Sequence, residues 1–312
     1  MDAGQVRSQV ALGALLLTIA ASASPAEAAV RHTWVAAVPT TWNIVPTGRD
    51  AIMDRSFGVT ETVFPTVVYR RYTRGFRRPV RNAPVTNVDH DLIPGPIVHA
   101  RVGDDLRIHF RNLDTTLRHS HSMHFHGVGY RPGSDGAFIP GFSGKGGDVK
   151  PGQTFTYRLR AKADSAGVWP YHDHSPSMHE SIAGGMYGAL SILGRRERRP
   201  DREFVTVFAP MQDFQTINGR AFVGNTPIYR ARVGDRVQWD VVALGSEHHT
   251  FHVHGHRWRT PAGTPEDTRT IGPAESFRVS WREDAPGTWL YHCHVEDHME
   301  RGMIGLYRVS RR

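Results

Sequence analysis

Eight of the 19 histidines in this 312-residue sequence form four His-x-His pairs at matched positions of an internal repeat. The pairs are residues 124/126, 172/174, 252/254 and 292/294. On a β-strand the side chains at positions i and i+2 point to the same face, so each pair presents two imidazoles together. Imidazole binds zinc, copper, iron or nickel, and one pair alone would be weak evidence for any of them. Four pairs at matched places in two halves of the chain predict metal binding.

The last pair encloses the single cysteine, and its surroundings indicate which metal is bound. Cys293 is followed by His298 and Met303. A cysteine thiolate, two histidines and a weak axial methionine form the blue-copper electron-transfer site. His249 lies an odd number of residues before the 252/254 pair, so on a strand it faces the other side and can supply the second histidine. We predict a copper site of these four residues, which the backbone joins directly to the last histidine pair.

Structural roles are the alternative for each of these residues. Cys293 could be a buried structural thiol and Met303 a core residue, but neither role explains the histidine between them. His99 and His109 lie in or beside an ordinary strand, and we expect both to be structural. Five further histidines flank the motifs without matching a repeat position, and we expect them at the surface or behind the ligands: His119, His121, His179, His248 and His256.

The sequence contains an internal repeat that positions the pairs. An Arg-Val-Gly-Asp turn at 101–104 returns at 232–235, and His-x-His-Gly at 124–127 returns at 252–255. The segment 169–174, Trp-Pro-Tyr-His-Asp-His, returns at 289–294 as Trp-Leu-Tyr-His-Cys-His. Three features in the same order predict two homologous domains. We place them at residues 33–194 and 203–312, joined by the charged linker 195–202.

Most segments of both halves have the pattern of β-strands. Residues 106–110, 155–159 and 277–281 alternate between apolar and polar side chains. Glycine and proline separate short segments of this kind along the whole chain, which is typical of β-sandwiches. We therefore predict an all-β protein built from two Greek-key β-sandwich domains.

Composition and the N-terminus indicate an exported protein. Arg7 precedes the apolar run 11–20, and small residues follow as far as Ala26 and Ala28. This is the pattern of a cleavable signal peptide over residues 1–29, and the run is too short for a permanent membrane helix. No other segment has the composition of a membrane span. The formal net charge of +8 comes without a nucleic-acid-binding motif, so we expect a solvated basic surface, no nucleic-acid partner and a secreted or periplasmic location.

The four histidine motifs together resemble the copper-binding signatures of multicopper oxidases. They read His-x-His-Gly, His-x-His, His-x-x-His-x-His and His-Cys-His-x₃-His-x₄-Met, and with two domains they are most similar to the bacterial small laccases. The resemblance implies cupredoxin-like domains and a type 1 copper at His249, Cys293, His298 and Met303. It implies a type 2 copper at His124 and His252. It implies a type 3 copper pair at His126, His172, His174, His254, His292 and His294.

This resemblance also implies a stoichiometry, an assembly and a reaction. Asp173 replaces the cysteine in the first domain, so that domain should hold no type 1 copper. The chain would then bind four copper ions, one for each electron that converts dioxygen to water. In small laccases the three-copper cluster forms between the first domain of one subunit and the second domain of the next, so we expect a homotrimer. The partners would be dioxygen and a small reducing substrate.

Tyr130 and Asp135 also match the small-laccase pattern, which places both beside the cluster. A carboxylate there could relay protons to reduced oxygen, and a tyrosine could lend an electron. The alternative is a glycine-rich turn in which the aspartate caps the backbone.

Three rival functions remain beside a laccase that oxidises phenols or aromatic amines. A ferroxidase or another metal-ion oxidase would use the same copper ligands, and Glu247, Glu296, Asp297 and Glu300 lie near them in sequence. A copper nitrite reductase resembles this chain in its two domains but carries a cysteine in the first one. A non-enzymatic copper protein would be expected to have lost cluster ligands, and none is lost. Glu247 and His248 replace two tyrosine-rich positions of small laccases, so the phenol preference is not carried over.

Overall fold

The computed structural model describes residues 28–80 and 92–311 together with Met1, so most of the expected signal peptide lies outside the described residues. Strands dominate these residues. The helices are short: α1 (Val59–Thr62), α2 (Met178–Ala183) and α3 (Glu296–Glu300), with 3-10 turns at Arg74–Phe76, Pro132–Ser134 and Lys145–Gly147. In the part of the chain that the structure describes, no helix is long and apolar enough to cross a bilayer.

Two sheets form the first sandwich, with strand orders β4-β1-β6-β9-β8 and β5-β11-β10-β7. The strands are β1 (Val30–Asn43), β4 (Val63–Tyr72), β5 (Val98–Arg101), β6 (Asp105–Asn112), β7 (His124–Phe125), β8 (Gly129–Tyr130), β9 (Thr154–Arg160), β10 (Gly167–His172) and β11 (Tyr187–Leu193). The apolar residues of both sheets meet in one core. Leu106, Ile108 and Phe110 are buried at alternate positions of β6, as the sequence predicts.

The second sandwich has the strand orders β13-β12-β15-β20 and β14-β22-β21-β16-β19. Its strands are β12 (Arg202–Met211), β13 (Phe214–Ile217), β14 (Ile228–Arg232), β15 (Arg236–Ala243), β16 (His249–Val253), β19 (Thr268–Ile271), β20 (Ser276–Arg282), β21 (Gly287–Cys293) and β22 (Ile304–Ser310). Two small hairpins add β2 (Arg49–Asp50) with β3 (Arg55–Ser56), and β17 (Trp258–Arg259) with β18 (Pro265–Glu266). A second core, rich in aromatic rings around Trp239, fills this sandwich.

The two sandwiches share one topology, which is the structural form of the sequence repeat. The order β4-β1-β6-β9 matches β13-β12-β15-β20, and β5-β11-β10-β7 matches β14-β22-β21-β16. Even the parallel pairs agree: β1 with β6 and β12 with β15, β5 with β11 and β14 with β22. The all-β, two-sandwich prediction is therefore confirmed, while the domain boundaries stay a prediction.

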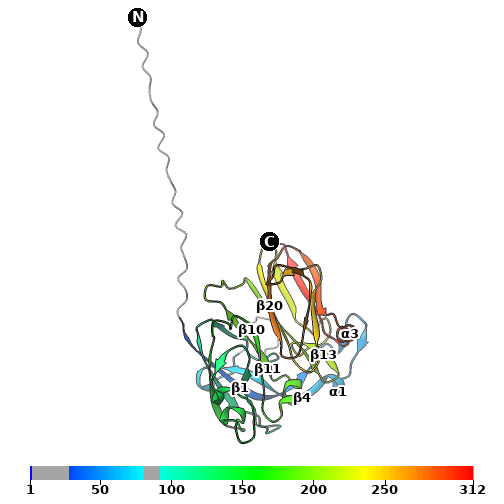
Figure 1. Ribbon diagram of the computed structural model, residues 1–312. Coiled ribbons are helices and arrows are strands. Elements are labelled where there is room, and N and C mark those ends of the chain that lie inside the picture. The colour runs from blue at the N-terminus through cyan, green and yellow to red at the C-terminus, as the bar shows by residue number, and fades with distance from the viewer. Residues whose placement is uncertain (2–27, 81–91, 312) are drawn as a thin grey trace.

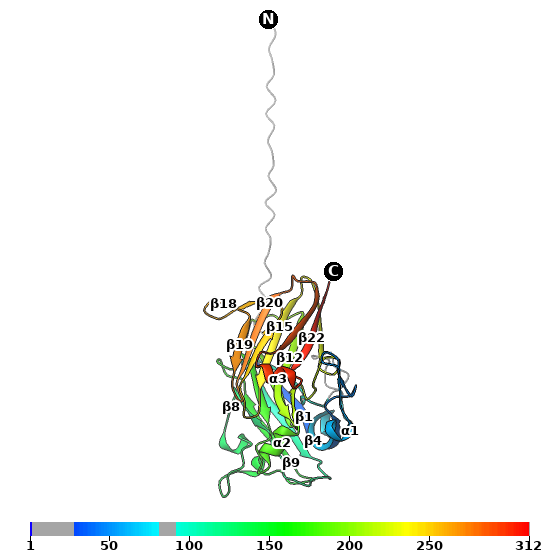
Figure 2. The same ribbon diagram turned by 90° about the vertical axis from the view of Figure 1, so that its right-hand side faces the viewer.

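A third apolar cluster lies between the sandwiches and fixes their relative position. It joins Tyr187 and Ala189 of β11 to Val205 and Val207 of β12. Figure 1 shows the blue-to-green half and the yellow-to-red half packed against each other. In the turned view of Figure 2, the green helix α2 belongs to the first sandwich, and the red helix α3 belongs to the second. Both short helices follow a histidine-bearing strand, β10 or β21, and α3 carries His298 of the site described next.

Candidate metal centres

A buried group of three potential metal ligands lies in the second sandwich. His249 begins β16, Cys293 ends β21 and His298 stands in α3. Nδ1 of His249 lies 3.1 Å from Nδ1 of His298, and these two nitrogens lie 3.8 and 3.7 Å from Sγ of Cys293. Met303 is fully buried, and its carbonyl accepts a hydrogen bond from the backbone N–H of Cys293. The structure thus brings His249, Cys293 and His298 together. The fourth predicted ligand, Met303, is hydrogen-bonded through its backbone to Cys293.

The spacing of these atoms fits a bound metal ion. Ligands held tetrahedrally at about 2.0–2.1 Å for nitrogen and 2.3 Å for sulfur lie roughly 3.3–3.6 Å from one another. Burial lowers the pKa of His249 to about 3, which keeps its imidazole neutral, as a ligand must be. Burial also raises the pKa of the Cys293 thiol, so metal binding there would release a proton. A soft sulfur with two imidazoles suits copper or zinc, and Thr250 donates its backbone N–H to that sulfur at 3.3 Å.

A carboxylate links this buried group to solvent. Oε2 of Glu247 lies 3.2 Å from Nε2 of His298 and accepts a 2.5 Å hydrogen bond from the Gln215 amide. The Glu247 side chain is 47% exposed, whereas that of His298 is 7% exposed. In the sequence Glu247 is only one of several acidic residues near the ligands. Its contact with His298 depends on a loop conformation that no sequence motif specifies.

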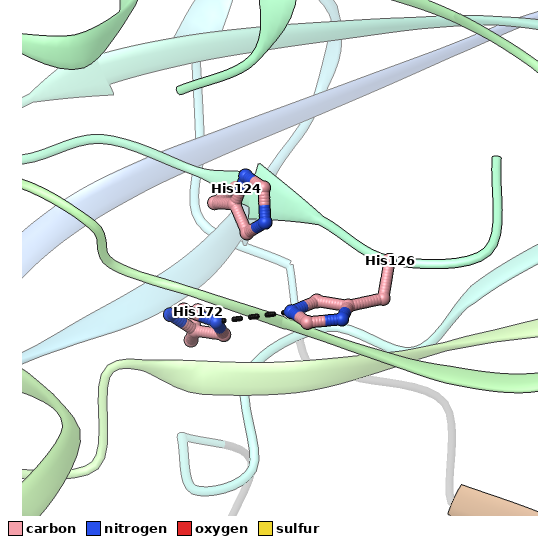
Figure 3. Close-up of side chains that lie close together, drawn as sticks. All are labelled: His124, His126 and His172. Carbon is pink, nitrogen blue, oxygen red and sulfur yellow. Dashed lines mark hydrogen bonds between the residues drawn. The ribbon is translucent and has the colours of Figure 1, made fainter. Parts of the chain in front are cut away.

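The first histidine group consists of His124, His126, His172 and His174, where β7 pairs with β10. His124 lies opposite His172 in the strand register. Nε2 of His126 lies 3.2 Å from Nε2 of His172, and the ring centre of His124 lies 5.3 Å from that of His174. Figure 3 shows three of these rings, from His124, His126 and His172, turned toward one another. The pairs predicted from sequence spacing therefore meet in space.

The second histidine group consists of His252, His254, His292 and His294, where β16 pairs with β21. His252 lies opposite His292, and Nε2 of His254 lies 3.1 Å from Nε2 of His292. The ring centre of His252 lies 5.6 Å from that of His294. This arrangement repeats the first group almost atom for atom, as the shared topology requires.

Backbone carbonyls set the orientation of the rings in both groups. Nδ1 of His124 donates to the carbonyl of Asp135 at 2.7 Å, and Nδ1 of His252 donates to that of Asp267 at 2.8 Å. The carbonyls one residue after His172 and His292 accept from their Nδ1 atoms at 2.8 Å. A donating Nδ1 leaves Nε2 as the lone-pair nitrogen, and Nε2 is the atom that faces the centre of each group. Burial lowers the pKa of His126, His172 and His292 to about 4, so these rings are neutral near pH 7.

The two histidine groups remain separate within one chain. Among the described residues, every close contact between these rings joins members of the same group. His254 and His294 are exposed, and His124, His126 and His174 are partly exposed. A cavity of about 360 Å³ also opens beside His126, lined by Trp169 and Arg269 among others. Each group is therefore accessible to a ligand or to another protein surface.

Tyr130 and Asp135 lie beside the first histidine group, as the resemblance implies. Oδ1 of Asp135 lies 3.4 Å from Nδ1 of His124, and the Tyr130 ring centre lies 6.2 Å from the His124 ring centre. Burial, the charge of Asp135 and a hydrogen bond to it raise the pKa of Tyr130. The proposed chemical roles of the two residues stay predictions.

The remaining histidines are mixed in their positions. His119, His179 and His248 are exposed. His256 is buried and pairs with Glu283 at 3.0 Å, behind His254. The expectation that His121 matches no repeat position is wrong. His121 lies three residues before His124, just as His249 lies three residues before His252. The His-x-His pairs alone do not show this correspondence.

Comparison with known proteins identifies similar families for both sandwiches. One family model described as multicopper oxidase matches residues 75–197, and another with the same description matches residues 195–312. A crystal structure titled multicopper oxidase is 25% identical, with a TM-score of 0.68, and the match covers 90% of this chain and 89% of that one.

Curated relatives are longer proteins. A probable nitrite reductase–hydroxylamine oxidoreductase fusion protein of Kuenenia stuttgartiensis is 30% identical over 71% of this chain and 28% of its own length. Ferroxidase HEPHL1 of Homo sapiens is 27% identical over 97% of this chain and 31% of its own length. The chain thus spans less than a third of each of these two relatives.

Proposed function

The chain belongs to the multicopper oxidase family, and on that premise we propose that it couples one-electron oxidation of a reducing substrate to the four-electron reduction of dioxygen to water. The position of Cys293 carries the proposal. Its sulfur lies in the buried group with His249 and His298, and its backbone neighbours His292 and His294 belong to the second histidine group. Substrate oxidation and oxygen reduction need separate sites joined by a short route, and the end of β21 supplies that connection.

Copper, when bound, supplies the one-electron oxidation at the buried site and the oxygen chemistry at the histidine groups. We infer four ions per chain, one for each electron. The type 1 ligands are His249, Cys293, His298 and Met303. The type 2 ligands are His124 and His252, and the type 3 ligands are His126, His172, His174, His254, His292 and His294. The carbonyl-held Nδ1 atoms of His124, His172, His252 and His292 support the assignment of these four residues.

The separation of the two histidine groups supports a homotrimer. Each group offers four imidazoles, whereas the proposed cluster needs eight. Their exposure lets the first group of one subunit meet the second group of the next. A contact between two different faces closes into a ring when its rotation is a simple fraction of a turn, and three subunits give such a ring.

We propose that Asp135 holds and passes protons during oxygen reduction, which consumes four protons for each dioxygen. Its Oδ1 is close to His124, and its side chain is 32% exposed, so it contacts both a proposed ligand and solvent. Tyr130 is hydrogen-bonded to it. This arrangement favours a proton relay over a turn that only caps the backbone.

The reducing substrate is a phenol or an aromatic amine in the primary proposal, with oxidation at the His298 edge of the buried site. A metal-ion oxidase is the second candidate, and one observation favours it: a half-exposed carboxylate, Glu247, rests directly on the outer nitrogen of His298. Carboxylate oxygen suits a ferrous ion, whereas a phenol hydroxyl would donate one hydrogen bond to it. The sequence of residues 1–29 supports export, so we propose a secreted or periplasmic enzyme.

Oxygen uptake by the copper-loaded protein tests the choice of substrate. A substituted phenol, ferrous ion and nitrite with a reductant under argon are offered in parallel, with Cys293→Ser as the blank. Rapid uptake with the phenol supports a laccase, and uptake mainly with iron supports a metal-ion oxidase. Nitrite turnover under argon, together with no oxygen uptake in air from either the phenol or the ferrous ion, would contradict the proposed oxygen reduction.

A further inference from the structure

The buried copper site of the second sandwich has a counterpart in the first. His121 stands where His249 stands, three residues before the strand-paired histidine. Asp173 stands where Cys293 stands, between two histidines of the group. The backbone N–H of Ser122 donates to Oδ1 of Asp173 at 2.7 Å, as that of Thr250 donates to Sγ of Cys293.

The other two ligand positions also correspond. The backbone N–H of Asp173 donates to the carbonyl of Met186 at 3.1 Å, and that of Cys293 donates to the carbonyl of Met303 at 3.1 Å. In turn Met186 donates to the carbonyl of Ser181, as Met303 does to that of His298. The first sandwich thus keeps the histidine and the methionine. It has Asp173 in place of the cysteine and Ser181 in place of the second histidine.

In the first sandwich, a hydrogen-bonded triad of Asp173, His121 and Asp114 lies where the second sandwich has the buried Cys293 group. Oδ2 of Asp173 lies 3.2 Å from Nδ1 of His121, and Oδ2 of Asp114 lies 3.3 Å from its Nε2. All three side chains are at most 1% exposed. Burial opposes ionisation of Asp173, but the hydrogen bonds it accepts hold its pKa below the usual range. Its carboxylate is therefore fixed by partners on two sides.

Asp173 is hydrogen-bonded to two histidines of the first group, directly to His172 and through Ser122 to His174. The carbonyl of Asp173 accepts the hydrogen bond from Nδ1 of His172 at 2.8 Å. Ser122 Oγ donates to Oδ1 of Asp173 at 3.1 Å and accepts the backbone N–H of His174 at 3.0 Å. Any movement of the Asp173 backbone or side chain would therefore shift the rings of His172 and His174.

We propose that Asp173, held by His121 and Asp114, is a positioning residue for the first histidine group. The triad replaces a bound metal as the element that fixes the end of β10, and it holds two imidazoles in place for the cluster. This inference rests on the proposed copper cluster. Outer partners that orient metal ligands typically contribute about 10–100-fold to metal affinity.

Asp173→Asn tests the proposal, with Asp104→Asn as the matched control. Asp104 is equally buried in the same sandwich and is bound by Arg31 and the backbone N–H groups of Ala29 and Arg101, away from the histidines. Both variants should lower the melting temperature of the metal-free protein. Copper titration should show a 10–100-fold weaker cluster and an altered near-ultraviolet absorption of the type 3 pair, which His172 and His174 would hold, in Asp173→Asn alone, with blue absorption unchanged.

Wild-type cluster affinity and spectrum in Asp173→Asn would overturn the proposal. If that variant does not fold, Ser122→Ala removes the hydroxyl that joins Asp173 to the backbone N–H of His174, and it should still alter the absorption of the type 3 pair. An unaltered spectrum in that variant would also overturn it. Failure of the proposed copper cluster looks different, because the wild-type protein itself would then bind no more than one copper per chain.

Discussion

Oε2 of Glu247 lies 3.2 Å from Nε2 of His298, so a half-exposed carboxylate stands between solvent and the buried Cys293 site. The Gln215 amide fixes that carboxylate from the other side. On the proposed function, we therefore expect a reducing substrate to approach the edge of His298 and the charge of Glu247 to affect which substrate binds there.

Glu247→Gln should raise the KM for ferrous ion by about ten- to one-hundred-fold, because one charged contact of about 1.5–3 kcal/mol is lost. The KM for a neutral phenol should change by less than about twofold, since the amide oxygen can still accept its hydrogen bond. Steady-state oxygen uptake measures both. Glu296→Gln, at an exposed position of α3, is the control. An equal effect in the two variants would remove Glu247 from substrate binding.

Asp135→Asn should lower kcat by about 100-fold or more, because a relay that donates protons contributes 10²–10⁴-fold. The blue absorption should be unchanged, since the Cys293 site is not touched. The pH dependence of kcat should also shift. Asp164→Asn, at an exposed loop position, should leave both properties unchanged. A wild-type kcat and pH profile in Asp135→Asn would eliminate the relay.

The metal-free protein should lose stability as the pH falls from 6.5 to about 4. Burial lowers the pKa of His126, His172 and His292 from the ordinary 6.5 to about 4. Between these pH values the unfolded chain binds protons that the folded chain does not. The free energy of unfolding therefore decreases as the pH decreases. Denaturant titrations at stepped pH measure it. His172→Gln should have a shallower slope, and an unchanged slope would refute the cause.

The copper-loaded protein should have the mass of three chains in solution, and activity should fall when dilution dissociates the trimer. Light scattering and oxygen uptake across a dilution series test this. The physical reason is that one chain holds its two histidine groups apart. A monomer that is fully active at micromolar concentration would contradict the shared cluster.

The sequence predicts the ligand-bearing strands well because their chemistry is local. Spacing by two places His292 and His294 on one face, and the odd offset of His249 places it with Cys293. The structure brings these residues together as expected. The repeated strand order also follows from repeated motifs such as Arg-Val-Gly-Asp.

What the sequence did not reveal depends on contacts between distant segments. Glu247 meets His298 through a loop, and no periodicity encodes that contact. Ser181 corresponds to His298 only after an insertion before α2, which hides the match from residue counting. The correspondence of His121 with His249 can be predicted from the sequence, because the spacing His-x-x-His-x-His occurs in both halves. The role of His121 depends on its contacts with the carboxylates of Asp114 and Asp173, which only the structure shows.

The number of electrons taken up for each dioxygen tests the central claim most directly. Oxygen consumption, oxidised donor and hydrogen peroxide are measured together for the copper-loaded protein and for Cys293→Ser. We expect four one-electron donors oxidised for each dioxygen, no peroxide, and loss of the reaction in Cys293→Ser. Two donors per dioxygen with one peroxide, or equal uptake in the variant, would contradict four-electron reduction fed through Cys293.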